Sequence, residues 1–330
     1  MYGTTLITGA TGLLGAELVN QLLESGESSR LVCLVRDFVP LSRFFTEGME
    51  RRVCVVRGDV RDLELISRTI NEYDVRTIFH LAAQTLVEKA NDLPTETLDV
   101  NIRGTWSVLE AARRHQNKVK AIVVASSDKA YGDLSGEKYD EQYPLAGRFP
   151  YDVSKSCTDL VTQSYAKSYG LNAAITRCGN FFGPGDLNEN RIFPSTILSL
   201  LRNERPVLRS NGKYIRDYLY IADAASAYRS LATQMLQKPL SGEAFNFSYG
   251  LRMTVLDVVQ SIKAAMGSRL EPVIQGTAEN EIPTQSLDST KAKTVLGWIP
   301  KYGFEEGIMK TIAWYTQYYQ PQLPKLKAVG

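Results

Sequence analysis

The 330-residue sequence predicts an α/β fold, a doubly wound parallel sheet with a smaller C-terminal lobe. The chain opens with a short apolar strand, a glycine-rich turn and an amphipathic helix. Strands and helices then alternate as far as residue 178, and the sequence beyond that point is rich in loops. We therefore expect one domain over residues 1–178 and a mainly separate lobe over residues 179–330, with segments that return to the first domain.

The opening turn reads Gly9-Ala10-Thr11-Gly12-Leu13-Leu14-Gly15, between a strand at residues 4–8 and a helix that ends near residue 24. Gly9 permits a tight turn, Gly12 lets the backbone approach a pyrophosphate, and Gly15 lets the helix pack closely on the strand. Amide groups at the start of the helix then face the phosphates. The turn therefore indicates a dinucleotide-binding loop formed by Gly9, Thr11, Gly12, Leu13, Leu14 and Gly15.

The later elements follow from short apolar, β-branched runs and from helical periodicity. Strands are expected at residues 30–35, 52–57, 77–81, 121–124 and 173–177, and helices at residues 96–114, 151–169 and 304–318. Runs that are apolar on both faces are typical of buried parallel strands. Ligands bind at the carboxyl ends of such strands, so the polar residues just after them are the candidates for a site.

The strand at residues 121–124 ends in the polar turn Ser126-Ser127-Asp128-Lys129, and the next helix opens with Tyr151 and Lys155. Tyr151 and Lys155 lie on one helix face, roughly 6 Å apart along the axis. A phenolate at pH 7 requires about 4 kcal/mol of differential stabilisation, which a neighbouring ammonium and a cofactor cation could supply. Of the seventeen tyrosines, Tyr151 alone has a lysine four residues later.

Together with the glycine-rich turn, these residues resemble the extended short-chain dehydrogenase/reductase family, Rossmann-fold enzymes that act largely on nucleotide sugars. The family signature Tyr-x-x-x-Lys is Tyr-Asp-Val-Ser-Lys here. The turn that continues as Ala130-Tyr131-Gly132 resembles that of the NAD-dependent sugar-nucleotide 4,6-dehydratases, and its Ser-Asp-Lys form is most similar to CDP-glucose 4,6-dehydratases. The resemblance extends from residue 8 to about residue 315.

The resemblance implies further cofactor residues. Arg36 and Asp37 end the second strand, where a basic residue favours NADP and an acid favours NAD, so the choice between the two cofactors stays open, with Arg43 as a possible second cation. His80 is expected to be structural. Asp59 could instead cap a helix, and Asn101 could instead brace a helix against a strand. The family positions beside the cofactor are Asp59, Val60, Leu81, Ala82, Ala83 and Asn101.

The resemblance also implies substrate residues, Gln84 among them. Asn180 matches an asparagine that touches the sugar diphosphate, and Arg191 opens a helix over the nucleotide. Arg216 matches an arginine that holds the diphosphate, a role that suits its planar donors, although a surface ion pair with Asp217 is the alternative. The arginine usual in the family before Asp288 is absent, which favours CDP over dTDP or UDP.

The residues then predict a redox-neutral 4,6-dehydration. Tyr151 takes the 4-hydroxyl proton with help from Ser127, Lys129 removes the C5 proton in its neutral form, and a protonated Asp128 protonates the departing 6-hydroxyl. The alternative within enzymes is a nucleotide-sugar 4-epimerase, which would make Asp128 and Lys129 bystanders in a loop salt bridge. A non-catalytic dinucleotide sensor is a remote alternative, since such a protein would be expected to lose Tyr151 or Lys155.

Composition limits the other possibilities. The net charge is +2, with lysine and arginine dispersed, so we expect no nucleic-acid partner. Four cysteines without a CxxC pair and two histidines indicate structural thiols and no metal site. No leader and no long apolar run is evident, so we expect a cytoplasmic protein without membrane contact. The family resemblance implies a homodimer paired through the helices at residues 96–114 and 151–169.

Overall fold

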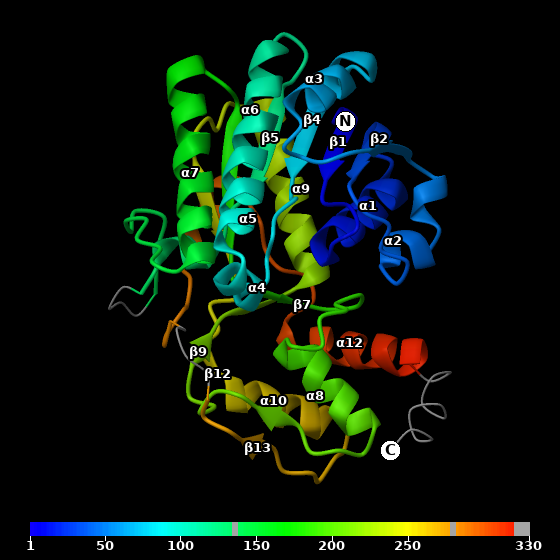
Figure 1. The fold of residues 1–330 in the computed structure, drawn as a ribbon, viewed down its shortest axis with the longest axis vertical. Helices are drawn as coiled ribbons and strands as arrows, with labels where there is room; N and C mark the ends of the chain where they lie inside the picture. Colours follow the sequence, from blue (N-terminus) through cyan, green and yellow to red (C-terminus); the bar gives the residue numbers. More distant parts are fainter. Residues whose placement is uncertain (134–137, 278–281, 320–330) are drawn as a thin grey trace.

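The computed structural model describes residues 1–133, 138–277 and 282–319, and it confirms the doubly wound α/β fold. A seven-stranded sheet with the order β11-β6-β5-β4-β1-β2-β3 forms its centre, and all neighbouring strands are parallel (Figure 1). The strands are β1 (Gly3–Thr8), β2 (Ser28–Val35), β3 (Cys54–Arg57), β4 (Val75–His80), β5 (Ala121–Ala125), β6 (Ala173–Cys178) and β11 (Ala244–Phe247).

Successive residues of each central strand belong to opposite faces of the sheet, because side chains alternate along a strand. Leu6 of β1 packs into one apolar cluster, and its neighbour Ile7 packs into the other. Ile122 and Val123 of β5 divide in the same way. Both faces are therefore buried, as a parallel sheet that is covered by helices requires.

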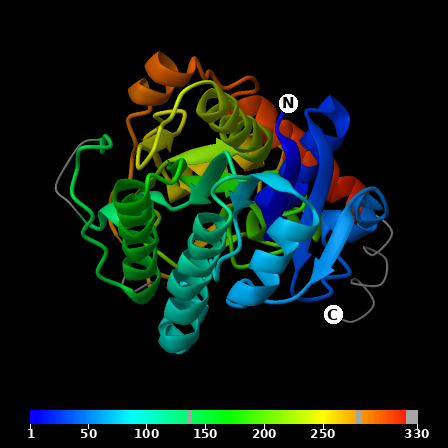
Figure 2. The same cartoon turned by 90° about the horizontal axis from the view of Figure 1, so that it is seen from above.

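Helices cover the two faces of the sheet (Figure 2). On one face lie α3 (Leu63–Glu72), α6 (Gly104–Arg114) and α7 (Pro150–Tyr169), which pack against one another in that order. On the other face α1 (Leu13–Ser25) packs against α9 (Ile221–Gln237). The short helices α2 (Arg43–Thr46) and η1 (Met49–Arg51) connect β2 to β3.

The continuous helix predicted at residues 96–114 is interrupted. The chain forms α4 (Val87–Asp92) and α5 (Pro94–Leu98), then a π-helical turn, η2 (Asp99–Arg103), before α6 begins. A π turn inserts an extra residue into the helix and is frequent at functional sites. Asn101 lies in this turn, where its side chain meets the loop that follows β4.

The remaining helices and small sheets form a lobe below the carboxyl ends of the central strands in Figure 1. Three short strand pairs belong to it: β7 (Asn180–Phe182) with β10 (Tyr218–Tyr220), β9 (Ile215–Arg216) with β12 (Met253–Thr254), and β8 (Val207–Leu208) with β13 (Val273–Ile274). Its helices are α8 (Ile192–Leu201), α10 (Val255–Ala265) and α12 (Phe304–Tyr319), whereas α11 (Thr290–Leu296) packs against β11 and α9. Between these segments the chain returns to the sheet through α9 and β11.

Aromatic side chains hold the lobe together. The rings of Phe182 in β7 and Phe193 in α8 are stacked with their centroids 4.2 Å apart, and Phe304 at the start of α12 meets both of them edge-on. All three side chains are buried. The short strand β7 follows β6 directly, and among the described residues after 178 such short strands and the helices are joined by loops.

Candidate active site

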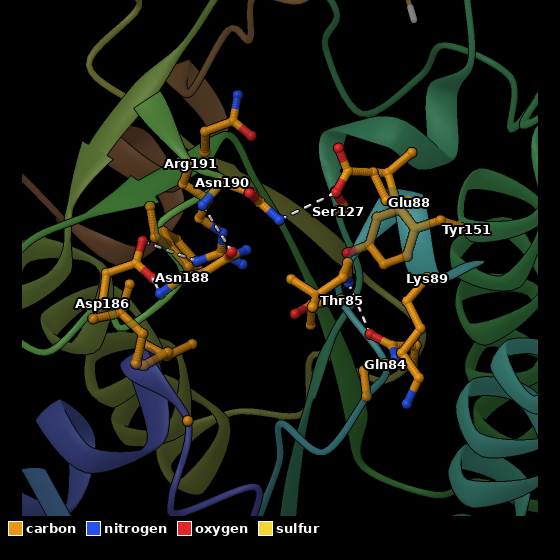
Figure 3. A pocket seen from close by; sticks show the side chains of 18 of the residues that line it. Gln84, Thr85, Glu88, Lys89, Ser127, Tyr151, Asp186, Asn188, Asn190 and Arg191 are labelled. Carbon is orange, nitrogen blue, oxygen red and sulfur yellow. Dashed lines mark hydrogen bonds and ion pairs between the residues drawn. The ribbon is translucent and has the colours of Figure 1, made fainter. Parts of the chain in front are cut away.

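A cavity of about 1630 Å³ runs along the carboxyl ends of the central strands and between the sheet and the lobe. Figure 3 shows Ser127, Tyr151 and Gln84 on one wall and Asp186, Asn188 and Arg191 on the other. The structure brings every predicted site residue except Asn101 to the wall of this cavity. These residues are Gly9, Thr11, Gly12, Leu13, Leu14, Gly15, Arg36, Asp59, Val60, Leu81, Ala82, Ala83, Gln84, Ser127, Asp128, Lys129, Tyr151, Lys155, Asn180, Arg191 and Arg216.

The glycine-rich turn forms a cradle at one end of the cavity. Gly9 has a positive φ of 77°, and a Cβ there would lie 2.8 Å from the amide nitrogen of Ala82. A Cβ on Gly15 would overlap the carbonyl oxygen of Gly9. Gly12 is the N-cap of α1 and gives it no side-chain cap, so the first amides of the helix end at the cavity wall. This cradle fits a dinucleotide pyrophosphate.

The residues expected near the adenosine end lie beside the cradle. Arg36 and Asp37 both line the cavity and form an exposed ion pair, with Nε 2.6 Å from Oδ2. Asp59 binds the side chain of Arg61 through both carboxylate oxygens, which lowers the pKa of Asp59. Asp62 rather than Asp59 caps α3, so the alternative of a capping role for Asp59 is wrong.

His80 has a structural position, as expected, and Asn101 has a supporting one. His80 is buried between the hydroxyl groups of Thr8 and Thr105, 2.9 and 3.1 Å from its ring nitrogens. Asn101 exchanges two hydrogen bonds with the backbone of Gln84, at 2.7 and 3.0 Å, so it braces the loop after β4. The predicted second cation, Arg43, pairs with Glu17 of α1 and with Glu47, the C-cap residue of α2, and does not line the cavity.

The polar turn after β5 forms a single turn of 3₁₀ helix, η3 (Asp128–Tyr131). Ser127 is its N-cap: the hydroxyl accepts from the amide of Lys129 at 3.2 Å and donates to Oδ1 of Asp128 at 3.0 Å. Asp128 is only 2% exposed, and burial raises its pKa, although Lys129, Ser127 and Arg216 oppose that shift. Its Oδ2 has no hydrogen-bond partner among the described residues.

A buried ion pair anchors this turn from behind. Arg177 in β6 and Asp159 in α7 form two hydrogen bonds of 2.8 Å. Arg177 also donates to the hydroxyl of Tyr131 at 2.9 Å, and that hydroxyl donates to Asn246 in β11 at 2.7 Å. The last residue of η3 is thus tied to two strands and a helix, which fixes the turn that carries Asp128 and Lys129.

Tyr151 and Lys155 occupy the first turns of α7, and both side chains are buried. Nζ of Lys155 donates to the carbonyl oxygen of Ala125 at 2.8 Å and lies 6.0 Å from the centre of the Tyr151 ring. Burial lowers the pKa of Lys155 to about 8. Burial also raises the pKa of Tyr151 above its ordinary value, against the opposing effects of Ser127 and Arg191. Desolvation of the phenol is thus the largest effect of the protein on this pKa, and the depression expected from the lysine together with a cofactor cation stays a prediction.

Three of the predicted substrate residues, Asn180, Arg191 and Arg216, come from the opposite wall. Asn180 lies in β7, and Arg191 is the N-cap of α8, with Nη1 3.2 Å from Oδ2 of Asp186. Arg216 is buried at β9 and donates to the carbonyl oxygen of Ile282 at 2.7 Å. A surface ion pair with Asp217 is therefore the wrong description of Arg216, since both side chains are buried.

The sequence interpretation missed Asp152. This residue lines the cavity at the start of α7 and is 2% exposed. Burial raises the pKa of Asp152 to about 6, an effect that Asp128 reinforces and Lys129 opposes. The sequence did contain a signal for Asp152, because it is an acid directly after Tyr151 in a helix turn that was expected to face the site.

A contact between the two walls was missed as well. Asn190 donates to Oε2 of Glu88 at 3.3 Å, and Arg209 pairs with the same carboxylate. All three residues line the cavity. Glu88 lies 102 residues before Asn190 and 121 before Arg209, so no local pattern in the sequence could have connected them.

The cysteines are free thiols, with Cys33 and Cys178 buried and Cys54 and Cys157 half-buried. In the part of the chain that the structure describes, no group of three or more histidine, cysteine or acidic residues is placed to hold a metal ion. Within the same residues, no helix combines the length and the apolar character needed to cross a membrane.

The fold and the Tyr151–Lys155 pair at the end of a dinucleotide cradle define an enzyme of the NAD-dependent epimerase/dehydratase class. Residues 6–311 match the family described as GDP-mannose 4,6 dehydratase, and the chain belongs to this family of nucleotide-sugar 4,6-dehydratases.

Curated relatives match nearly the whole chain. A dTDP-glucose 4,6-dehydratase of Streptomyces antibioticus is 31% identical, over 94% of this chain and 91% of that protein. A CDP-glucose 4,6-dehydratase of Salmonella typhimurium is 30% identical, over 94% of this chain and 89% of that protein.

Solved structures of both reaction types have the same fold. The UDP-glucose 4-epimerase of Thermotoga maritima, solved with UDP-glucose, has a TM-score of 0.86 at 27% identity and covers 96% of this chain and 99% of that chain. The dTDP-glucose 4,6-dehydratase of Streptomyces venezuelae, solved with NAD, has a TM-score of 0.85 at 26% identity and covers 96% and 98%.

Proposed function

We propose that this enzyme converts CDP-glucose to its 4-keto-6-deoxy form, with Ser127, Asp128, Lys129, Tyr151 and Lys155 as the catalytic residues. The observation that carries the proposal is the turn η3, which places a buried carboxyl beside a lysine at the cavity wall. Water loss needs an acid and a base, and burial shifts the pKa of Asp128 in the direction that an acid requires. A 4-epimerase needs neither group.

Each side chain has one task in the proposed reaction. Tyr151 takes the proton of the 4-hydroxyl, and Ser127 hydrogen-bonds the same oxygen. Lys129 removes the C5 proton, which the C4 ketone has made acidic. Asp128 then protonates the 6-hydroxyl as it leaves as water. Bound NAD supplies the hydride chemistry, from C4 and back to C6, so the reaction has no net oxidation.

NAD is the cofactor that we favour. Its pyrophosphate fits the cradle at Gly9, Gly12 and Gly15, and solved relatives contain NAD. The guanidinium of Arg36, which would attract an extra ribose phosphate, is already paired with Asp37. Burial raises the pKa of Tyr151, and a bound oxidised cofactor would supply a positive charge that opposes this rise.

Two features support cytidine as the nucleotide. The Ser127-Asp128-Lys129 turn resembles that of CDP-glucose dehydratases, and the segment before Asp288 lacks the arginine that dTDP and UDP enzymes of the family often carry. Asn180, Arg191 and Arg216 would hold the diphosphate, with most of the substrate contacts coming from residues after 178.

We also propose a homodimer formed through α6 and α7. Leu160 and Tyr169 of α7 are 54% and 51% exposed in the single chain, an apolar surface that a second copy would cover. The cytoplasm remains the predicted location.

Product mass after incubation with CDP-glucose, UDP-glucose, dTDP-glucose and GDP-mannose tests the function. Loss of one water from CDP-glucose, without net reduction of the cofactor, is the expected result. A product of unchanged mass but altered sugar stereochemistry in the NMR spectrum would show a 4-epimerase instead. Cofactor binding without turnover of any nucleotide sugar would favour the dinucleotide sensor.

A further inference from the structure

Lys129 is held by a side chain from a distant part of the sequence. Its Nζ lies 3.2 Å from Oε1 of Gln285, 156 residues further along the chain. Gln285 is fully buried, and its side chain is not part of the cavity wall. Among the residues of the cavity wall, the side chain of Gln285 thus contacts Lys129.

The segment that carries Gln285 is fixed on both sides. The amide of Gln285 donates to the carbonyl oxygen of Ile215 at 3.0 Å, beside a backbone bridge between Ile215 and Thr284. Two residues later, the amide of Leu287 donates to Oδ2 of Asp217 at 3.1 Å, and Leu287 bridges Tyr139. The amide oxygen of Gln285 is therefore a fixed point against which Lys129 is aligned.

A contribution to fold stability does not explain why a glutamine occupies position 285. The hydrogen bond to Lys129 is the only one that its amide makes among the described residues, and Nε2 is buried without a partner. A buried donor without a partner destabilises a fold, so an apolar residue of similar size would suit the position better if packing were its only task. An ammonium can only donate, so the oxygen is the amide atom that faces Lys129.

The Gln285 amide carries no charge, and this matters if Lys129 has to act as a base in its neutral form. Among the described residues, Asp128 on the same turn and Asp152 on α7 are coupled to Lys129 and favour its ammonium form. Arg216 acts on Asp128 from the opposite wall. An added carboxylate at 3.2 Å would stabilise the ammonium further, whereas an amide oxygen accepts the hydrogen bond without adding charge.

We propose that Gln285 is a positioning residue for Lys129, whose amide oxygen directs the amine towards the cavity without adding negative charge. This inference rests on the proposed dehydratase function, in which Lys129 removes the C5 proton. It predicts that Gln285 affects the C5 step and leaves the C4 step alone.

The test compares Gln285→Glu, which adds a charge at constant shape, with Gln285→Met, which removes the acceptor. The matched control is Gln237→Glu on the exposed end of α9. For each protein, kcat is measured against pH, with substrate deuterated either at C5 or at C4. The reactivity of the Lys129 amine is measured separately, by competitive labelling and mass spectrometry across pH.

In Gln285→Glu we expect the rising, acidic limb of the kcat profile and the labelling midpoint of Lys129 to move up by about one pH unit or more. At a pH on the acid side of that limb, this shift gives a roughly tenfold loss of rate. In Gln285→Met both move down, and the plateau of kcat falls about tenfold because the amine is no longer aligned. In both variants the C5 isotope effect rises and the C4 isotope effect does not. Gln237→Glu behaves like the wild type.

The wild type could dehydrate CDP-glucose while the Gln285 variants leave the limb of the kcat profile, the labelling midpoint of Lys129 and the C5 isotope effect unchanged. That result would overturn the role of Gln285 and leave the proposed function intact. A wild type that dehydrates none of the nucleotide hexoses would overturn the proposed function and this inference together. If Gln285→Glu does not fold, the labelling midpoint of Lys129 in Gln285→Met tests the role of Gln285, and an unchanged midpoint would overturn it.

Discussion

At the scale of single residues, Asp128 is the side chain on which the proposed reaction depends most. It is buried, and among the described residues only one of its carboxylate oxygens is hydrogen-bonded. Burial raises its pKa. Asp128→Asn keeps the shape but removes the proton donor, so we expect the rate of water loss to fall by about 10² to 10⁴. Product mass spectrometry measures this loss. Asp133→Asn, at an exposed position in the loop after η3, should retain full activity. An active Asp128→Asn enzyme would remove the acid role.

His80 predicts a pH dependence of stability. Burial lowers its pKa from 6.5 to about 3, so between these values the unfolded chain binds a proton that the folded chain does not. Stability is therefore lost as the pH falls from about 6.5 towards 3, at about 1.4 kcal/mol per pH unit from this residue. His80→Gln, measured by urea unfolding, should reduce the slope by about that amount. Equal slopes for the two proteins would contradict the prediction.

At the scale of secondary-structure elements, the helix α1 offers a matched pair of glycines. Gly9 before it and Gly26 after it both have positive φ, but a Cβ would be crowded only at Gly9. Gly26→Ala should cost about 1 kcal/mol of stability and leave NAD binding unchanged. Gly9→Ala should cost about 2 kcal/mol or more and weaken NAD binding at least tenfold. Chemical unfolding and calorimetric titration with NAD measure both. Equal NAD affinity in the two variants would argue against the cradle.

The elements also show how far the sequence could predict the site. The strands and their polar ends could be predicted because apolar runs and glycine spacing are local signals. A bracing role for Asn101 was one of the alternatives that the sequence left open, but its place in a π turn was not, since no periodicity marks that turn. The brace formed by Arg177 with Asp159 and Tyr131 could not be predicted, because it joins three elements that are far apart in the sequence. The pKa of Tyr151 could not be predicted either, because the sequence identifies neighbours along a helix and says nothing of the burial around it.

At the scale of the whole molecule, the dimer is the main prediction. Leu160→Glu places a charge on the exposed apolar surface of α7, and we expect the variant to be a monomer by light scattering while the wild type is a dimer. Leu236→Glu, at an exposed position of α9 on the other face of the sheet, is the matched control and should remain dimeric. A monomeric wild type, or a dimeric Leu160→Glu variant, would contradict the prediction.

The return of the chain through α9 and β11 has a consequence for its synthesis on the ribosome. A nascent chain that ends at Cys178 has β1 to β6 but lacks β11, so β6 is left as an unpaired edge, and it lacks α9, so part of the α1 face of the sheet is bare. The sheet is completed only after Phe247 has emerged, when the segments of the lobe between β6 and α9 have already been made. The two parts of the protein therefore mature together during translation, and a truncation between them would yield an aggregation-prone chain.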